Sequence, residues 1–344
     1  MRSGLLHASV LVLATCLPLL GQNSDRSSHM PVALRELVPA SDPLARQDLT
    51  FDGRFAELAL RYLHSPDPGV LDQLATSPAA AHLLEHARNF DYDVPKDSTR
   101  ALVKQLLSAP KGDRATCEKS LAYFTGPMLA NPQWVNDTLG YLPQDFRFHG
   151  SLFLIYGYDI GVAFHSAASL NCGHPHFAQH SNELTYYAIH ELHHVGFMSY
   201  QPPPRLADIK TCRDLLHLVE YSTQLEGMAV LAAYQRRRDE HALADDSDYV
   251  ALEDAQRMQH DEELYFADLH YLEKRGNEPA DADAWAVITR MSSGERLWYR
   301  VGAKMAQSIE RTWGRPELIA LIRQGPGAFR SRYEALRKQP QSEH

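Results

Sequence analysis

The sequence predicts an α+β fold that is mostly helical and carries a small sheet beside its central helix. Apolar residues recur at helical spacing along most of the 344 residues, and prolines separate these stretches. Strand-like composition is confined to residues 146–165. The motif His190-Glu191-x-x-His194 follows in an apolar, helical stretch, so we expect the sheet to lie next to the helix that carries it.

Residues 1–21 have the features of a signal peptide. A basic residue precedes an apolar run that ends at Leu20, and Gly21 suits the position before a cleavage site. The run is short for a membrane span, and we expect no transmembrane span in the mature chain. The protein is therefore predicted to be exported, to the periplasm or to the outside of the cell. Cleavage near Gly21 is favoured, and a lipoprotein anchored at Cys16 is the alternative.

Composition narrows the class of protein. Hydrophobic residues make up 44% of the chain, which is enough for a substantial core, and the net charge of −9 argues against nucleic acid as a partner. Three cysteines remain after cleavage, Cys117, Cys172 and Cys212, and no CxxC pattern indicates a thiolate zinc site. Cys172 and Cys212 lie on either side of the motif helix, so we expect them to pair.

The mature chain divides into three predicted parts. Residues 22–42 are polar and are predicted to form a flexible leader. Residues 43–144 carry helical patterns broken by prolines and show no evident chemistry. They are interpreted as a helical N-terminal region that packs on the rest of the protein, with a role in lining a cleft as the alternative. Residues 145–344 form the domain that carries the motif.

Three stretches at the start of this domain are predicted to be strands. They are Phe146–Phe148, Ser151–Tyr156 and Gly161–His165, and the last two are separated by a turn. An edge strand at this place could hold an extended substrate through backbone hydrogen bonds.

The motif predicts a zinc site. Residues four apart on an α-helix lie about 40° apart around the axis and about 6 Å apart along it, so His190 and His194 can hold one Zn²⁺. Glu191 can then act as a general base beside the open coordination position. His193 also lies within reach of this face, but we expect it to support the ligands from behind or to face the solvent.

A second predicted helix, from Cys212 to Tyr234, supplies the third metal ligand. Glu226 lies in the middle of its otherwise small and apolar face, where a carboxylate is costly to bury unless it is paired or bound to metal. A salt bridge between helices is the alternative. Gly227 allows another backbone to come close, whereas His217 and Glu220 lie on the other side of the helix.

Two other groups of polar residues are given a structural interpretation. His174, His176 and His180 lie in a loop-like stretch and are taken as surface or supporting histidines, with metal or substrate binding as the alternative. The acidic run from Ser247 to Arg275 is predicted to be one helix with a solvated face.

The last notable helix is predicted over residues 293–313, with a capping box between Ser292 and Glu295. Small residues lie below Tyr299 on one face, at Gly302, Ala303 and Ala306. This arrangement would let Tyr299 reach into a cleft.

With His190-Glu191-x-x-His194 followed by Glu226-Gly227-Met228-Ala229, the chain resembles the gluzincins, the thermolysin-like class of zinc peptidases. More narrowly, it is similar to a bacterial family of zinc-dependent peptidases of unassigned function. The resemblance implies a zincin-like catalytic domain in residues 145–344. The chain also departs from thermolysin. Val230 stands where an acidic residue would orient the zinc ligands, so another group must orient them.

Tyr299-Arg300-Val301-Gly302 resembles a helix of the zinc aminopeptidases related to leukotriene hydrolase. In those enzymes the tyrosine stabilises the oxyanion, and the resemblance gives this catalytic role to Tyr299. Their glycine-rich exopeptidase motif is not visible here, so endopeptidase activity is favoured over aminopeptidase activity.

These features predict an exported peptidase that uses one Zn²⁺, held by His190, His194 and Glu226, to cleave a peptide or protein substrate. Glu191 and Tyr299 are the predicted catalytic residues. The alternative is a zinc-binding protein without catalysis, with a structural or partner-binding role. A fourth protein ligand from His174, His176 or His180 would favour that alternative.

Overall fold

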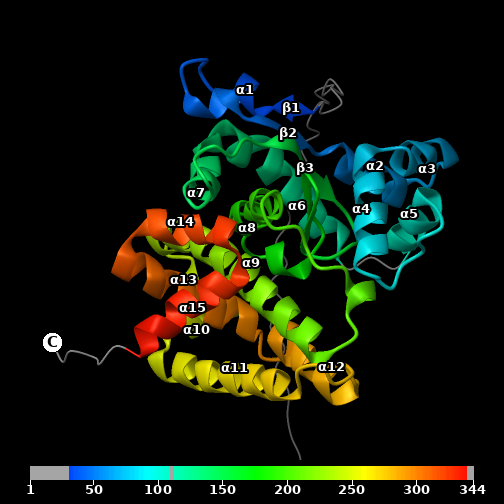
Figure 1. Cartoon of the computed structure of the whole chain (residues 1–344). Coiled ribbons are helices and arrows are strands. Elements are labelled where there is room, and N and C mark those ends of the chain that lie inside the picture. Colours follow the sequence, from blue (N-terminus) through cyan, green and yellow to red (C-terminus); the bar gives the residue numbers. More distant parts are fainter. Residues whose placement is uncertain (1–30, 109–111, 339–344) are drawn as a thin grey trace, which may run out of the picture.

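The computed structural model describes residues 31–108 and 112–338 and confirms a mostly helical α+β fold (Figure 1). The predicted signal peptide, the alternative anchor at Cys16 and the first part of the predicted leader lie outside the described residues. Of the helices in these ranges, none has both the length and the apolar character that crossing a membrane requires.

Five strands within the described residues form one mixed sheet. The strands are β1 (Val32–Ala33), β2 (Asp48–Asp52), β3 (His149–Ile155), β4 (Gly161–Phe164) and β5 (Ala167–Asn171). Their order is β1-β2-β3-β5-β4, in which β2, β3 and β5 run parallel and the two outer strands run antiparallel to their neighbours. The sheet therefore combines strands from both sides of the predicted boundary at residue 145, and the boundary itself stays a prediction.

The structure confirms two of the three predicted strands, as β3 and β4. The prediction for Phe146–Phe148 is wrong, because both rings turn into the core and pack edge to face there, without a strand. The sequence did not indicate β1, β2 or β5, because β1 has only two residues and β2 and β5 are short and carry polar residues.

Helices of the N-terminal part pack around the sheet and beside it. They are α1 (Leu34–Leu37), α2 (Arg54–His64), α3 (Pro68–Ala75), α4 (Pro78–Asn89), α5 (Thr99–Ser108), α6 (Arg114–Tyr123) and α7 (Val135–Leu139). Prolines at the first positions of α3 and α4 fix where these helices begin, since proline suits a helix start. In Figure 1, α2 to α5 lie on one side of the central helix and the C-terminal helices lie on the other.

The central helix α8 (Glu183–Met198) carries the motif and packs on β4 and β5. It is apolar on nearly every side and almost wholly buried, as expected for a helix inside a domain. Asn182 precedes the helix without a side-chain capping bond.

Helix α9 (Cys212–Asp239) packs against both α8 and α13 (Leu297–Trp313). A capping box between Thr211 and Asp214 fixes its start, and it extends beyond the predicted end at Tyr234. The remaining C-terminal helices are α10 (Ser247–Glu253), α11 (Ala255–Arg275), α12 (Ala282–Thr289), α14 (Arg315–Gln324) and α15 (Pro326–Arg337).

Two helix predictions in this region are wrong in detail. The acidic run is not one helix but α10 and α11, because the Asp254 side chain caps a new helix at the backbone N–H groups of Gln256 and Arg257. The predicted capping box at Ser292 does not form either. Residues 290–294 make a π-helix, and α13 begins only after Arg296, which has left-handed backbone angles.

The predicted Cys172–Cys212 pairing is wrong. Cys172 is bonded to Cys117 instead, and Cys212 is buried and free. The physical reason is the path of α9, whose first residue is held by the backbone of Glu278. Cys172 lies at the end of β5, next to the start of α6, where the Asp113 N–H donates to the Gly173 carbonyl.

Candidate metal centre

The two motif histidines of α8 lie one turn apart, and their side chains meet on one face of the helix. Their ring centroids are 4.5 Å apart. The ligand atoms of His190, Glu191 and His194 all lie within 4.8 Å of one another. The spacing of the motif therefore brings its three polar side chains together on one face of the helix.

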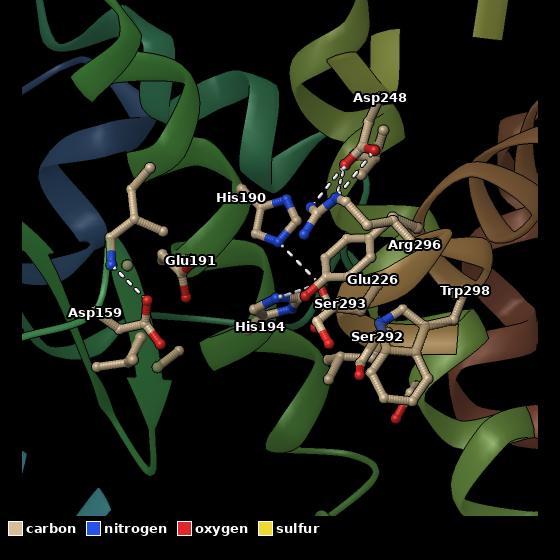
Figure 2. A pocket seen from close by; sticks show the side chains of 18 of the residues that line it. Asp159, His190, Glu191, His194, Glu226, Asp248, Ser292, Ser293, Arg296 and Trp298 are labelled. Carbon is tan, nitrogen blue, oxygen red and sulfur yellow. Dashed lines mark hydrogen bonds and ion pairs between the residues drawn. The ribbon is translucent and has the colours of Figure 1, made fainter. Parts of the chain in front are cut away.

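Glu226 reaches the same point from α9. Its Oε2 lies 3.0 Å from His190 Nε2 and 3.1 Å from His194 Nε2 (Figure 2). Burial alone would raise the pKa of Glu226, but the positive charge of His194 and hydrogen bonds from both imidazoles hold this pKa well below its ordinary value. The carboxylate is therefore ionised, as a metal ligand must be.

These atoms fit a zinc ion. Two imidazole nitrogens and one carboxylate oxygen converge from two packed helices, which is the donor set of a catalytic zinc with an open fourth position. The salt-bridge alternative describes the same contacts. However, one oxygen of Glu226 lies at nearly equal distances from the two imidazole nitrogens. This is the arrangement expected of three atoms that bind the same metal ion.

Glu191 lies beside this centre and is pressed against the sheet. Burial raises its pKa to about 8. The start of β4 lies so close that a Cβ atom on Gly161 would be 2.6 Å from Glu191 Oε1. Only glycine fits at this position without moving the carboxylate.

Tyr299 faces the centre from α13. Its ring is stacked on that of His190, with centroids 6.4 Å apart and an angle of 22° between the planes. Burial raises the pKa of Tyr299, reinforced by the negative charge of Glu226. The phenol therefore keeps its proton and remains a hydrogen-bond donor.

Comparison with known proteins adds one finding. A family model described as "Putative zinc dependent peptidase (DUF5700)" matches residues 71–341. The chain belongs to this family. The match confirms the predicted resemblance to a family of zinc-dependent peptidases, and it supports a hydrolase that uses zinc. No curated protein and no solved structure matches the chain.

The residues that match this zinc peptidase family enclose a cavity of about 1060 Å³ in front of the metal centre. Residues that precede α8 in the chain and residues that follow it both line the cavity. Phe90 and Tyr92 come from the N-terminal region, while Trp285 and Arg296 come from the C-terminal helices. The N-terminal helical region thus helps to line the cleft, which was the alternative interpretation of its role.

The other histidines of the region lie in different contacts. His193 is fully buried, and its ring lies 3.3 Å from the Tyr141 carbonyl oxygen, so it faces away from the solvent. His176 is 2.8 Å from Glu183, and His180 is 3.7 Å from Asp245. Neither His176 nor His180 is bonded to the three predicted ligands among the described residues.

A buried ion pair braces α8 against α9 away from the centre. Arg237 donates two hydrogen bonds of 2.6 Å to the two carboxylate oxygens of Glu183, the first residue of α8. The guanidinium lies between the rings of Tyr186 and Tyr249, 4.4 Å from each centroid. His176, Glu183 and Asp246 could also group around a cation, but Arg237 already supplies that positive charge.

No acidic residue in the described part of the chain orients His194 through its Nδ1 in place of the acid that Val230 replaces. The Nδ1 of His194 is buried and has no hydrogen-bond partner among the described residues. Packing on α8 and the contact with Glu226 therefore set the orientation of this ring.

Sequence reasoning missed several residues of the cavity, chiefly Gly161, Asp248, Trp285 and Arg296. A glycine at the head of a strand beside the motif helix is the one signal that could have indicated Gly161. Arg296 gave no such signal, since neither its left-handed backbone nor its partner Asp248 can be inferred from local sequence.

Proposed function

We propose that this protein is an exported zinc peptidase that hydrolyses peptide bonds, with Glu191 as the general base. One observation carries the proposal: Glu226 Oε2 meets both His190 Nε2 and His194 Nε2 at the wall of a large cavity. One zinc ion bound by these three residues would supply Lewis acidity and lower the pKa of a water molecule to about 7.

Glu191 carries the protons in this mechanism. Its carboxylate takes a proton from the attacking water and later gives it to the leaving amine, so the same oxygen serves both steps. Burial of Glu191 favours its protonated form, which helps this carboxyl group to hold the proton between the two steps.

Tyr299 is the proposed oxyanion donor. Its protonated phenol lies next to His190 on the side of the cavity, where it can donate to the oxygen that becomes negative. Such a donor contributes on the order of 3 kcal/mol to transition-state stabilisation.

Strand β4 is the proposed binding edge for the peptide. It pairs with β5 on one side and is the last strand of the sheet. Its other edge can accept an extended chain through backbone hydrogen bonds, and its first residue, Gly161, lies against Glu191. A substrate on this edge would lie beside the base.

Two finer features of the proposal, the position of cleavage and export, have separate support. Cleavage within a peptide, rather than trimming from the amino end, rests on the absence of the exopeptidase motif from the sequence. Export rests on the N-terminal signal features, and the Cys117–Cys172 disulfide supports it because disulfides persist in oxidising compartments.

A zinc-binding protein without catalysis is the alternative. It would close the fourth coordination position with a protein ligand. The pairing of His176 with Glu183 and of His180 with Asp245 favours the catalytic proposal instead.

The test is zinc content together with peptide-library cleavage by the wild type and by Glu191→Gln. We expect about one zinc per chain in both proteins, cleavage by the wild type, and at least about a hundredfold loss in the variant. Equal cleavage by the variant would remove Glu191 as the base. Zinc binding without cleavage by either protein would favour the non-catalytic alternative.

A further inference from the structure

Arg296 occupies an unusual position at the edge of the cavity. Its backbone has φ 55° and ψ 39°, in the left-handed region that residues with a side chain rarely adopt. The preceding residues, 290–294, form a π-helix, another irregular element. Two irregularities next to each other cost stability, and such strain is typically kept where it positions a functional side chain.

Ion pairs hold the Arg296 side chain in place. Its Nε and Nη2 donate to Asp248 Oδ2 at 2.8 and 2.7 Å (Figure 2). Arg300 Nε donates to the other oxygen, Asp248 Oδ1, at 2.8 Å. Asp248 is buried, so two cations share one buried anion. Arg300 also lies near a second buried carboxylate, with 3.6 Å between its Nη1 and Asp261 Oδ2.

The guanidinium still has donors to offer. Asp248 accepts hydrogen bonds from Nε and Nη2, which form one edge of the guanidinium. Nη1 has no acceptor among the described residues. A guanidinium has five N–H groups, so the edge formed by Nη1 and the second hydrogen of Nη2 remains available. That edge matches the two oxygens of a carboxylate.

The Arg296 side chain lies at the wall of the cavity. The Arg296 side chain is 37% exposed and lines the cavity, and its guanidinium lies 3.9 Å from the centroid of the Tyr299 ring. Arg300 carries the same charge but is only 10% exposed and does not line the cavity. Of the two cations on Asp248, Arg296 is therefore the one that a ligand can reach.

We propose that Arg296 binds a carboxylate of the peptide substrate, which selects peptides that carry this group close to the bond that is cut. The inference rests on the proposed peptidase function and adds a substrate class to it. The carboxylate is either the C-terminus of a short peptide or an Asp or Glu side chain. In both cases the pairing is a charge-assisted, two-point contact.

The test uses pairs of short peptides that differ only in a free acid or an amide at the C-terminus. A second series of C-terminal amides carries Glu or Gln at each position in turn. Zinc-loaded wild type, Arg296→Gln and Arg300→Gln are compared by kcat/KM. Binding of the same peptides to Glu191→Gln, with and without Arg296→Gln, is measured by calorimetry, so that the readout does not depend on turnover.

We expect the wild type to prefer the carboxylate peptide in one of the two series by about ten- to hundredfold, the value of one charged hydrogen-bonded contact. The series that shows the preference identifies the source of the carboxylate. Arg296→Gln should bring the ratio close to one in both cleavage and binding, and Arg300→Gln should keep it, whatever its overall rate.

Equal cleavage of all paired peptides by the wild type would overturn the role of Arg296 and leave the peptidase function standing. An unchanged ratio in Arg296→Gln would also overturn it. Failure of the wild type to cleave any peptide would count against the peptidase function itself, and the calorimetric ratio would still decide whether Arg296 binds a carboxylate.

Discussion

Gly227 and Gly302 bring the backbones of α9 and α13 into direct contact. A Cβ atom on Gly227 would lie 2.1 Å from the carbonyl carbon of Gly302, and a Cβ atom on Gly302 would lie 2.3 Å from the Thr223 carbonyl oxygen. Gly227 directly follows Glu226, and Gly302 lies one turn after Tyr299. The close crossing of these helices therefore brings the predicted third ligand and the proposed oxyanion donor to the same centre.

The variant Gly302→Ala should disturb both stability and the metal centre. The new methyl group meets backbone atoms that cannot turn aside, so α13 must move away from α9, at a cost of about 1–3 kcal/mol. We expect a lower urea midpoint and at least about a tenfold loss of kcat. Gly327→Ala is the matched control, because a Cβ atom there meets nothing within 4 Å. Wild-type stability in Gly302→Ala would show that the crossing can relax.

The variant Gly161→Ala should affect catalysis more than folding. Its methyl group would lie 2.6 Å from Glu191 Oε1 and 2.9 Å from Glu191 Cγ, so the Glu191 side chain must shift while the proposed metal ligands stay in place. We expect kcat to fall at least about tenfold, with zinc content and the unfolding midpoint close to wild type. Gly126→Ala adds a methyl group in open space and serves as the control. A normal kcat would mean that the position of Glu191 tolerates this shift.

The variant Glu226→Gln should lower the affinity for zinc. It keeps the shape of the side chain but removes the charge that two imidazoles and a metal ion require. Metal analysis after dialysis against a weak chelator should show a zinc occupancy that is reduced at least about tenfold relative to wild type. Glu220→Gln on the same helix removes a carboxylate that pairs with Arg330 and should keep its zinc. Full occupancy in Glu226→Gln would place the third ligand elsewhere.

His86 should make the protein less stable in mild acid. Burial, reinforced by the neighbouring His82, lowers the pKa of His86 to about 3, from an ordinary value of about 6.5. Below pH about 6.5 the unfolded chain binds a proton that the folded chain refuses, so stability falls as the pH falls. Between pH about 6.5 and about 5 this residue should cost about 2 kcal/mol.

Urea unfolding of His86→Phe at about pH 7 and about pH 5 tests this expectation. The readout is the change between the two pH values, which should be smaller than in wild type by about 2 kcal/mol, whatever the absolute stability of the variant. His260→Gln replaces an exposed histidine and should behave like wild type. An identical pH dependence in His86→Phe would show that the folded protein accommodates a charged His86.

Local sequence was sufficient to predict that His190, His194 and Glu226 come together. The i, i+4 spacing of His190 and His194 needs only a helix, and the position of Glu226 on an apolar face needs only the helical period. The contacts of all three side chains follow from that periodicity once α8 and α9 pack together.

Features that depend on contacts distant in sequence could not be predicted. The partner of Cys172 is set by the position of α6, and β2 joins β3 across nearly a hundred residues. The left-handed backbone of Arg296 is stabilised by Asp248 from another helix, so nothing in its own neighbours indicates it. Each of these three features depends on how distant segments pack, so a local sequence pattern does not predict it.

The Glu183–Arg237 pair has a consequence for how the protein matures. The pair joins α8 to α9, and the glycine crossing joins α9 to α13. Contacts within the protein therefore hold the proposed zinc pocket together. Removal of zinc by a chelator should leave a folded apoprotein that regains activity on resupply, unlike small domains whose folding depends on their metal. We therefore expect folding and metal acquisition to be separate events.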